Sequence, residues 1–91
     1  MTHEFQVAVP PAEVLRRAKT FFTERVPMYA ASPEREGPGF LALRGQGGEE
    51  LVFAVRAVDG GTRVRASTLF FDQAIARFVS TLPPLVREGV S

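Results

Sequence analysis

The 91-residue sequence contains no cysteine and only one histidine, His3. Without cysteine, disulfide frameworks and thiolate metal sites are excluded. A catalytic triad needs a base beside a nucleophile, and no pattern around His3 supplies one. We therefore expect His3 to be a solvated residue near the terminus, and we expect no metal and no cofactor.

Long apolar runs and a strong excess of one charge are also missing. No stretch approaches the roughly 20 apolar residues of a membrane-spanning helix. The first residues show no basic segment followed by an apolar run, so we expect no signal peptide and a cytoplasmic, bacterial protein. The formal net charge is +1. Nucleic-acid-binding domains usually carry a larger basic excess, so nucleic acid is not the expected partner.

The composition that remains is that of one small globular domain, spanning residues 1–91. Hydrophobic residues make up 45% of the chain, which is typical of a folded protein. Phe5, Val7 and Val9 alternate with polar or small residues and predict a half-buried strand over residues 4–9. Pro10 and Pro11 end this strand.

A helix is predicted next, because Pro11 suits a first helical turn and apolar residues then recur at helical spacing. It runs to Val26, and Pro27 ends it. Residues 28–39 are rich in proline, glycine and charge. They predict a surface loop, with or without one helical turn around Tyr29, which could line a ligand entrance or cover the core edge.

Three further strands are predicted over residues 40–44, 51–58 and 62–70. The glycines at 45–48 form a turn, and Asp59-Gly60-Gly61 forms a tight hairpin. Neither glycine stretch is followed directly by a helix, so neither predicts a phosphate-binding loop.

The hairpin separates two faces, because side chains alternate along a strand. The predicted core face consists of Leu51, Phe53, Val55, Ala57, Val64, Ala66, Thr68 and Phe70. The opposite face consists of Val52, Ala54, Arg56, Val58, Arg63, Arg65, Ser67 and Leu69.

A second helix is predicted over residues 73–88, with Asp72 as its N-cap and Gly89 at its C-terminal cap. Its apolar positions stay on one side through Pro83 and Pro84, which predicts one helix curved over the sheet. The alternative is a short second helix capped by Thr81, with both prolines in its first turn.

The fold class that follows is α+β. Elements in the order β-α-β-β-β-α form a two-layer sandwich, in which a four-stranded antiparallel sheet of order 1-4-3-2 has two helices on one face.

Two stretches, VAVPPAEVLRRAKTFF and VDGGTRVRAS, resemble the opening strand–helix and the late hairpin of START/Bet v 1-like domains, also called helix-grip or polyketide cyclase-like. Four strands would make this a reduced form. The resemblance implies a small apolar ligand or protein segment bound between the sheet and the C-terminal helix. The implied lining, for which ordinary core packing is the alternative, is Phe21, Phe22, Phe53, Val55, Phe78 and Leu82.

The outer face of the sheet is unusually apolar for a solvated surface. We expect a homodimer in which Val52, Ala54, Val58 and Leu69 stack, with Leu41 or Leu43 beside them and with Arg56 and Arg65 at the rim. Edge pairing through the strand at 40–44 is a second route.

No residue set predicts catalysis. Glu49 and Glu50 are neighbours on a strand, so their carboxylates diverge, and Glu49 is expected opposite Arg44. We therefore predict a non-enzymatic binding module. The alternatives are an interaction homodimer without a small ligand and, ranked lower, an RNA-binding protein or a cyclase- or hydrolase-type enzyme.

Overall fold

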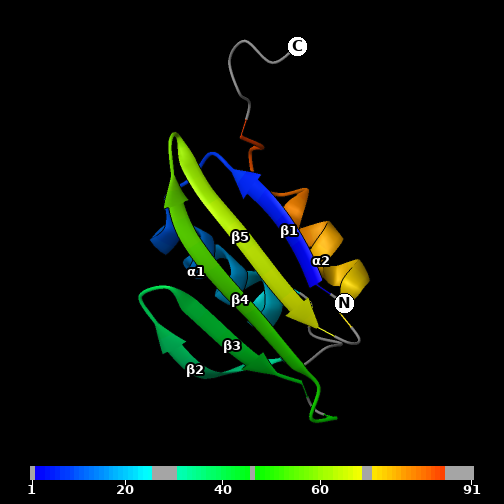
Figure 1. Cartoon of the computed structure of the whole chain (residues 1–91). Coiled ribbons are helices and arrows are strands. Elements are labelled where there is room, and N and C mark those ends of the chain that lie inside the picture. Colours follow the sequence, from blue (N-terminus) through cyan, green and yellow to red (C-terminus); the bar gives the residue numbers. More distant parts are fainter. Residues whose placement is uncertain (1, 26–30, 46, 69–70, 86–91) are drawn as a thin grey trace.

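A computed structural model describes residues 2–25, 31–45, 47–68 and 71–85. Five antiparallel strands form one sheet in the order β1-β5-β4-β3-β2. The helices cover one face of the sheet and leave the other uncovered (Figure 1). The α+β class and the two layers match the prediction.

The elements follow one another along the chain with short connections. The strands are β1 (Thr2–Val7), β2 (Ser32–Gly37), β3 (Phe40–Arg44), β4 (Glu50–Val58) and β5 (Gly61–Thr68). The helical segments are α1 (Pro11–Thr20), the π-helical η1 (Phe21–Arg25) and α2 (Asp72–Val79).

The predicted count of four strands is wrong. The four predicted strands correspond to β1, β3, β4 and β5 and have the predicted neighbours, but β2 lies in the predicted loop and adds a fifth strand at the edge beside β3. Its sequence, SPEREG, has no apolar alternation, and its register shifts between Pro33 and Arg35. Charge, proline and a bulge are features of a protected edge strand. Because β2 lacks apolar alternation, the sequence pattern does not predict it as a strand.

The predicted pairing of the β4–β5 hairpin is confirmed. Leu51 lies opposite Thr68, and Phe53 lies opposite Ala66, and all four are buried. On the neighbouring strand, Leu41 and Leu43 pair with Phe53 and Leu51 and are buried on the same face. The expectation that Leu41 or Leu43 lies on the outer face is therefore wrong.

Three phenylalanine rings connect the two layers. Phe22 from η1, Phe53 from β4 and Phe78 from α2 are each 0% exposed. Their ring centroids lie 5.6 Å apart for Phe22 and Phe53, 5.9 Å for Phe22 and Phe78, and 5.6 Å for Phe53 and Phe78. These are the tilted and edge-on geometries that aromatic pairs prefer.

The predicted first helix begins at Pro11 as expected but changes to a π-helix at Phe21. Its expected end at Val26 and Pro27, and the turn around Tyr29, lie outside the described residues.

The prediction of one curved helix over residues 73–88 is wrong, because α2 ends at Val79. The two prolines instead run beside the free edge of β1. Ala8 N donates to Pro83 O at 2.9 Å, and Leu85 N donates to Gln6 O at 3.1 Å. Proline disfavours helical backbone in the residue before it, so Leu82-Pro83-Pro84 leaves the helix and covers this edge.

The alternative of a second helix capped by Thr81 is also wrong for residues 82–85, which are not helical. Thr81 Oγ1 instead donates to Phe78 O at 2.6 Å, back toward the end of α2. Gly89 and the rest of residues 86–91 lie outside the described residues.

At Gly61 the backbone of β5 comes close to that of β1, and this contact supplies the first testable prediction. A Cβ at Gly61 would lie 1.9 Å from Val7 O, so Gly61→Ala must push the two strands apart. We expect a loss of about 2–3 kcal/mol in the free energy of unfolding, measured by urea denaturation. Gly39→Ala is the control, because its Cβ would meet Val55 O at an ordinary 3.7 Å. Equal stability of the two variants would contradict the prediction.

Candidate functional site

The six residues implied as a ligand lining lie in or against the hydrophobic core. Phe22, Phe53, Phe78 and Leu82 are buried, and Phe21 and Val55 are partly buried against them. The Phe21 ring packs on Phe22 at 5.0 Å and on Phe78 at 5.5 Å between centroids. The rings thus contact one another, as core residues do. Ligand binding between sheet and helices stays a prediction.

His3 is not simply a solvated terminal residue, and that expectation is wrong. Its Nε2 lies 2.6 Å from Asp72 Oδ1, and both side chains are about one-third exposed. Asp72 is also not the N-cap, since α2 begins at Asp72 and Phe71 occupies the cap position. The contact therefore joins the start of β1 to the start of α2. The hydrogen bond from His3 lowers the pKa of Asp72 below its usual range.

The neighbouring carboxylates of Glu49 and Glu50 form contacts at the β3–β4 connection. Glu50, not Glu49 as predicted, lies opposite Arg44. Arg44 Nη2 lies 3.5 Å from Glu50 Oε2 and 3.1 Å from Glu34 Oε1, and Nη1 donates to Gly48 O at 2.9 Å. Glu49 Oε1 accepts from Gly47 N at 3.1 Å. Over the residues that the structure describes, no three acidic or histidine side chains could hold a metal.

The uncovered face of the sheet, here called the outer sheet face, combines apolar and basic residues. Its apolar strip consists of Phe40 on β3 and of Val52 and Ala54 on β4, and Phe40 lies opposite Ala54. Phe40 is 38% exposed, the largest value for a bulky apolar side chain among the described residues. Val58 lies farther along β4 on the same face, and Leu69 is outside the described residues.

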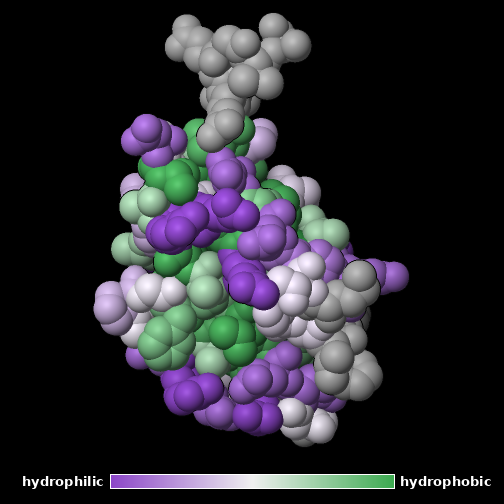
Figure 2. Space-filling model, viewed as in Figure 1, coloured by the Kyte–Doolittle hydropathy of each residue, from purple (hydrophilic) through white to green (hydrophobic). Residues whose placement is uncertain are grey.

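Three arginines form a basic cluster beside this strip. Arg56 and Arg63 lie directly opposite each other on β4 and β5, and Arg65 lies opposite Ala54. With Glu4 they line a shallow depression of about 370 Å³, and Arg63 Nη2 lies 3.5 Å from Glu4 Oε1. Figure 2 shows hydrophilic residues crossing this face above a more apolar area. The cluster sits on the middle strands of the sheet.

The second predicted dimer route, edge pairing through residues 40–44, is wrong because β2 covers that edge. The exposed edge of β2 is charged, and the edge of β1 is bonded to Pro83 and Leu85. Both features oppose edge-to-edge pairing.

Two sets of residues at these surfaces were not among the predicted site residues. Phe40 was not assigned to the outer sheet face, because its face depends on the β3–β4 register. Arg16 and Arg17 are the second set, and their spacing of three and four residues from Glu13 is the signal that indicates an ion-pair cluster.

Comparisons of the chain with protein-family models, curated proteins and solved structures each returned no match. The resemblance to helix-grip domains therefore stays a prediction. Within the described part of the chain, neither α1 nor α2 nor any other helix has the length and apolar character needed to cross a bilayer.

The His3–Asp72 contact generates a prediction about pH. Because the folded pKa of Asp72 is lowered, chiefly by the hydrogen bond from His3, the ionised carboxylate contributes stability that is present above its usual pKa of 3.8 and is lost as the pH falls through the lowered value. Asp72→Asn should therefore lower the thermal midpoint at pH 7, and the difference from wild type should shrink in acid.

Thermal unfolding followed by circular dichroism from pH 7 to about pH 2 tests this. Asp59→Asn, in the exposed β4–β5 turn, is the matched control and should leave the profile unchanged. A constant difference between Asp72→Asn and wild type across the whole range would exclude the contact as the cause.

Proposed function

We propose that this chain is a non-enzymatic binding module whose partner is a second copy of itself, stacked on the outer sheet face. The main supporting observation is the arrangement of residues along β4. Along β4, Val52 and Ala54 flank Phe53. Glu50 lies two residues before Val52, and Arg56 lies two residues after Ala54. All four alternate onto the outer sheet face.

This arrangement is self-complementary when the second copy runs antiparallel. A twofold axis that lies in the interface and crosses the strands at the level of Phe53 reverses β4 in the partner. Ala54 then faces Val52 of the partner subunit, and Arg56 faces Glu50 of the partner subunit. On the neighbouring strand, Arg65 is paired with Ala54 and Ser67 with Val52, so Arg65 faces Ser67 of the partner subunit.

The distances suit such a pairing. At about 3.3 Å per residue, Arg56 and Glu50 each lie about 10 Å from the level of Phe53. Stacked sheets pack about 10 Å apart with their strands roughly 30° from alignment, which long arginine and glutamate side chains can span. A twofold axis along the strands would instead set Arg56 against Arg56, so charge selects the antiparallel stack.

The first experiment measures mass. Light scattering at micromolar concentration should give about twice the monomer mass of 10.0 kDa. Val52→Asp would bury two unpaired carboxylates, one per copy, and should weaken dimerisation at least 100-fold while the subunit stays folded. Ala76→Asp, on the exposed side of α2, should leave the mass unchanged. A wild-type monomer would overturn the proposal.

The second experiment tests the register by charge reversal. Arg56→Glu sets two carboxylates against each other at each end of the stack and should weaken dimerisation about tenfold. Adding Glu50→Arg restores opposite charges and should recover most of the loss. Arg77→Glu on α2 controls for net charge. If the double variant is weaker than Arg56→Glu alone, the antiparallel register is wrong.

A further inference from the structure

A groove in the helical layer, on the opposite side of the molecule from the outer sheet face, has its own chemistry. It has a volume of about 340 Å³ and is lined by Arg16, Arg17, Thr20, Phe21 and Thr81. The first four belong to α1 and the start of η1, and Thr81 follows the end of α2. Its volume falls at the lower end of the range for small-molecule pockets.

The charge in this groove is fixed by a three-residue network. Arg16 donates from Nε to Glu13 Oε1 at 2.8 Å and from Nη2 to Glu13 Oε2 at 2.5 Å. Arg17 donates from Nε to Glu13 Oε2 at 2.7 Å. These bonds hold the pKa of Glu13 at about 2, so the carboxylate is ionised at neutral pH. Two guanidiniums and one carboxylate leave a net charge of +1 at the groove.

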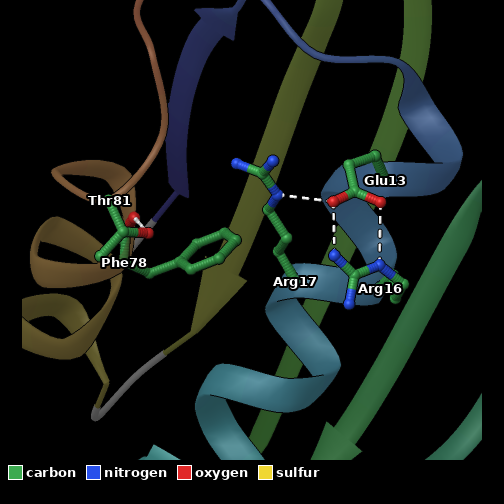
Figure 3. A network of polar contacts seen from close by, with 5 residues as sticks. All are labelled: Glu13, Arg16, Arg17, Phe78 and Thr81. Atoms are coloured by element: carbon green, nitrogen blue, oxygen red, sulfur yellow. Dashed lines mark hydrogen bonds and ion pairs between the residues drawn. The ribbon is translucent and has the colours of Figure 1, made fainter.

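Arg16 and Arg17 differ in how many of their guanidinium donors bond to Glu13. Arg16 engages both carboxylate oxygens of Glu13, whereas Arg17 uses only Nε. Figure 3 shows the guanidinium of Arg17 between Glu13 and Phe78, with its two terminal nitrogens directed away from Glu13. Among the described residues no hydrogen-bond partner is found for these two nitrogens, and their fork matches a carboxylate.

The rest of the lining supplies an apolar surface and hydroxyl groups. The Phe21 ring is half-buried and is supported from behind by Phe22 and Phe78. Thr81 Oγ1 donates to Phe78 O, and its lone pairs still accept hydrogen bonds. Phe21 is also the first residue of the π-helical turn, and such turns are rare and frequently occur at functional sites.

We propose that this groove binds a small organic monoanion, a carboxylate with an aromatic or short apolar body. The carboxylate pairs with the terminal nitrogens of Arg17, and the body lies on the Phe21 ring beside Thr20 and Thr81. The groove is separate from the space between sheet and helices, which the phenylalanine rings occupy.

The test is a titration of ¹⁵N-labelled protein with benzoate at constant pH and ionic strength, followed by NMR. The amide signals of Thr20, Phe21 and Thr81 should shift and saturate. Arg17→Met keeps the apolar stem and the helix propensity and should bind benzoate about tenfold more weakly or worse. Arg77→Met, an exposed arginine on α2, should bind as wild type.

Two other probes distinguish the contribution of the ligand's charge from that of its aromatic ring. Benzamide has the ring without the charge, and inorganic phosphate has charge without the ring, so both should bind more weakly than benzoate. Competition by phosphate as effective as by benzoate would overturn the proposed ligand class. Equal benzoate binding by wild type and Arg17→Met, or shifts at Arg56 and Arg63 in place of the groove, would overturn the site.

Folding and self-association are controlled separately. Should Arg17→Met unfold, Arg17→Lys keeps the charge, loses the fork and should still weaken binding. The Val52→Asp variant should bind benzoate as wild type, because Val52 lies on the outer sheet face. Failure of the dimer and failure of the groove are therefore distinguishable.

Discussion

Contact among the rings of Phe22, Phe53 and Phe78 is the constraint on which the rest of this structure depends. The three residues come from η1, β4 and α2, and each is fully buried. Burying a phenylalanine contributes about 1.5–3 kcal/mol, and a favourable ring pair adds about 0.5–1.5 kcal/mol. Against a total stability of about 5–15 kcal/mol for a domain of this kind, this cluster is a large share. It holds both helical segments on one face of the sheet, and the other face is uncovered as a consequence.

The sequence predicts the parts of this fold that depend on local periodicity. Alternation in β4 and β5, with Asp59-Gly60-Gly61 between them, predicted the hairpin and most of its buried face correctly. Ala57, expected on the core face, is exposed, and Phe70 lies outside the described residues. In this chain, helical periodicity predicts which side chains are buried better than it predicts the backbone conformation. Leu82 fits the helical stripe of α2 and is buried, yet it lies beyond the helix in the segment that runs along β1. The helical spacing correctly predicted that the Leu82 side chain is buried, but the two prolines after it prevent a helical backbone there.

The remaining features depend on contacts between distant residues, which one sequence does not reveal. β2 has no period of its own, and it is held by pairing with β3 and by ion pairs of Glu34 with Arg44 and of Glu36 with Lys19. His3 and Asp72 meet although 69 positions separate them. The face of Phe40 depends on the β3–β4 register, which is set by a connection in which Gly48 has φ of +88°.

Apolar and basic residues share the outer sheet face because the helices cover only the opposite face of the sheet. A sheet covered on one side must expose the other, and arginine stems shield apolar surface while their charged ends stay in water. Arg56 and Arg63, however, lie directly opposite each other, and like charges in that position destabilise a strand pair. Among the described residues only Glu4 lies near this cluster as a counter-charge. In the proposed dimer, an antiparallel second copy would bring Glu50 of the partner subunit to Arg56 and apolar side chains to Val52 and Ala54. That contact would offset the repulsion and the exposure together, whereas a twofold axis along the strands would set Arg56 against Arg56.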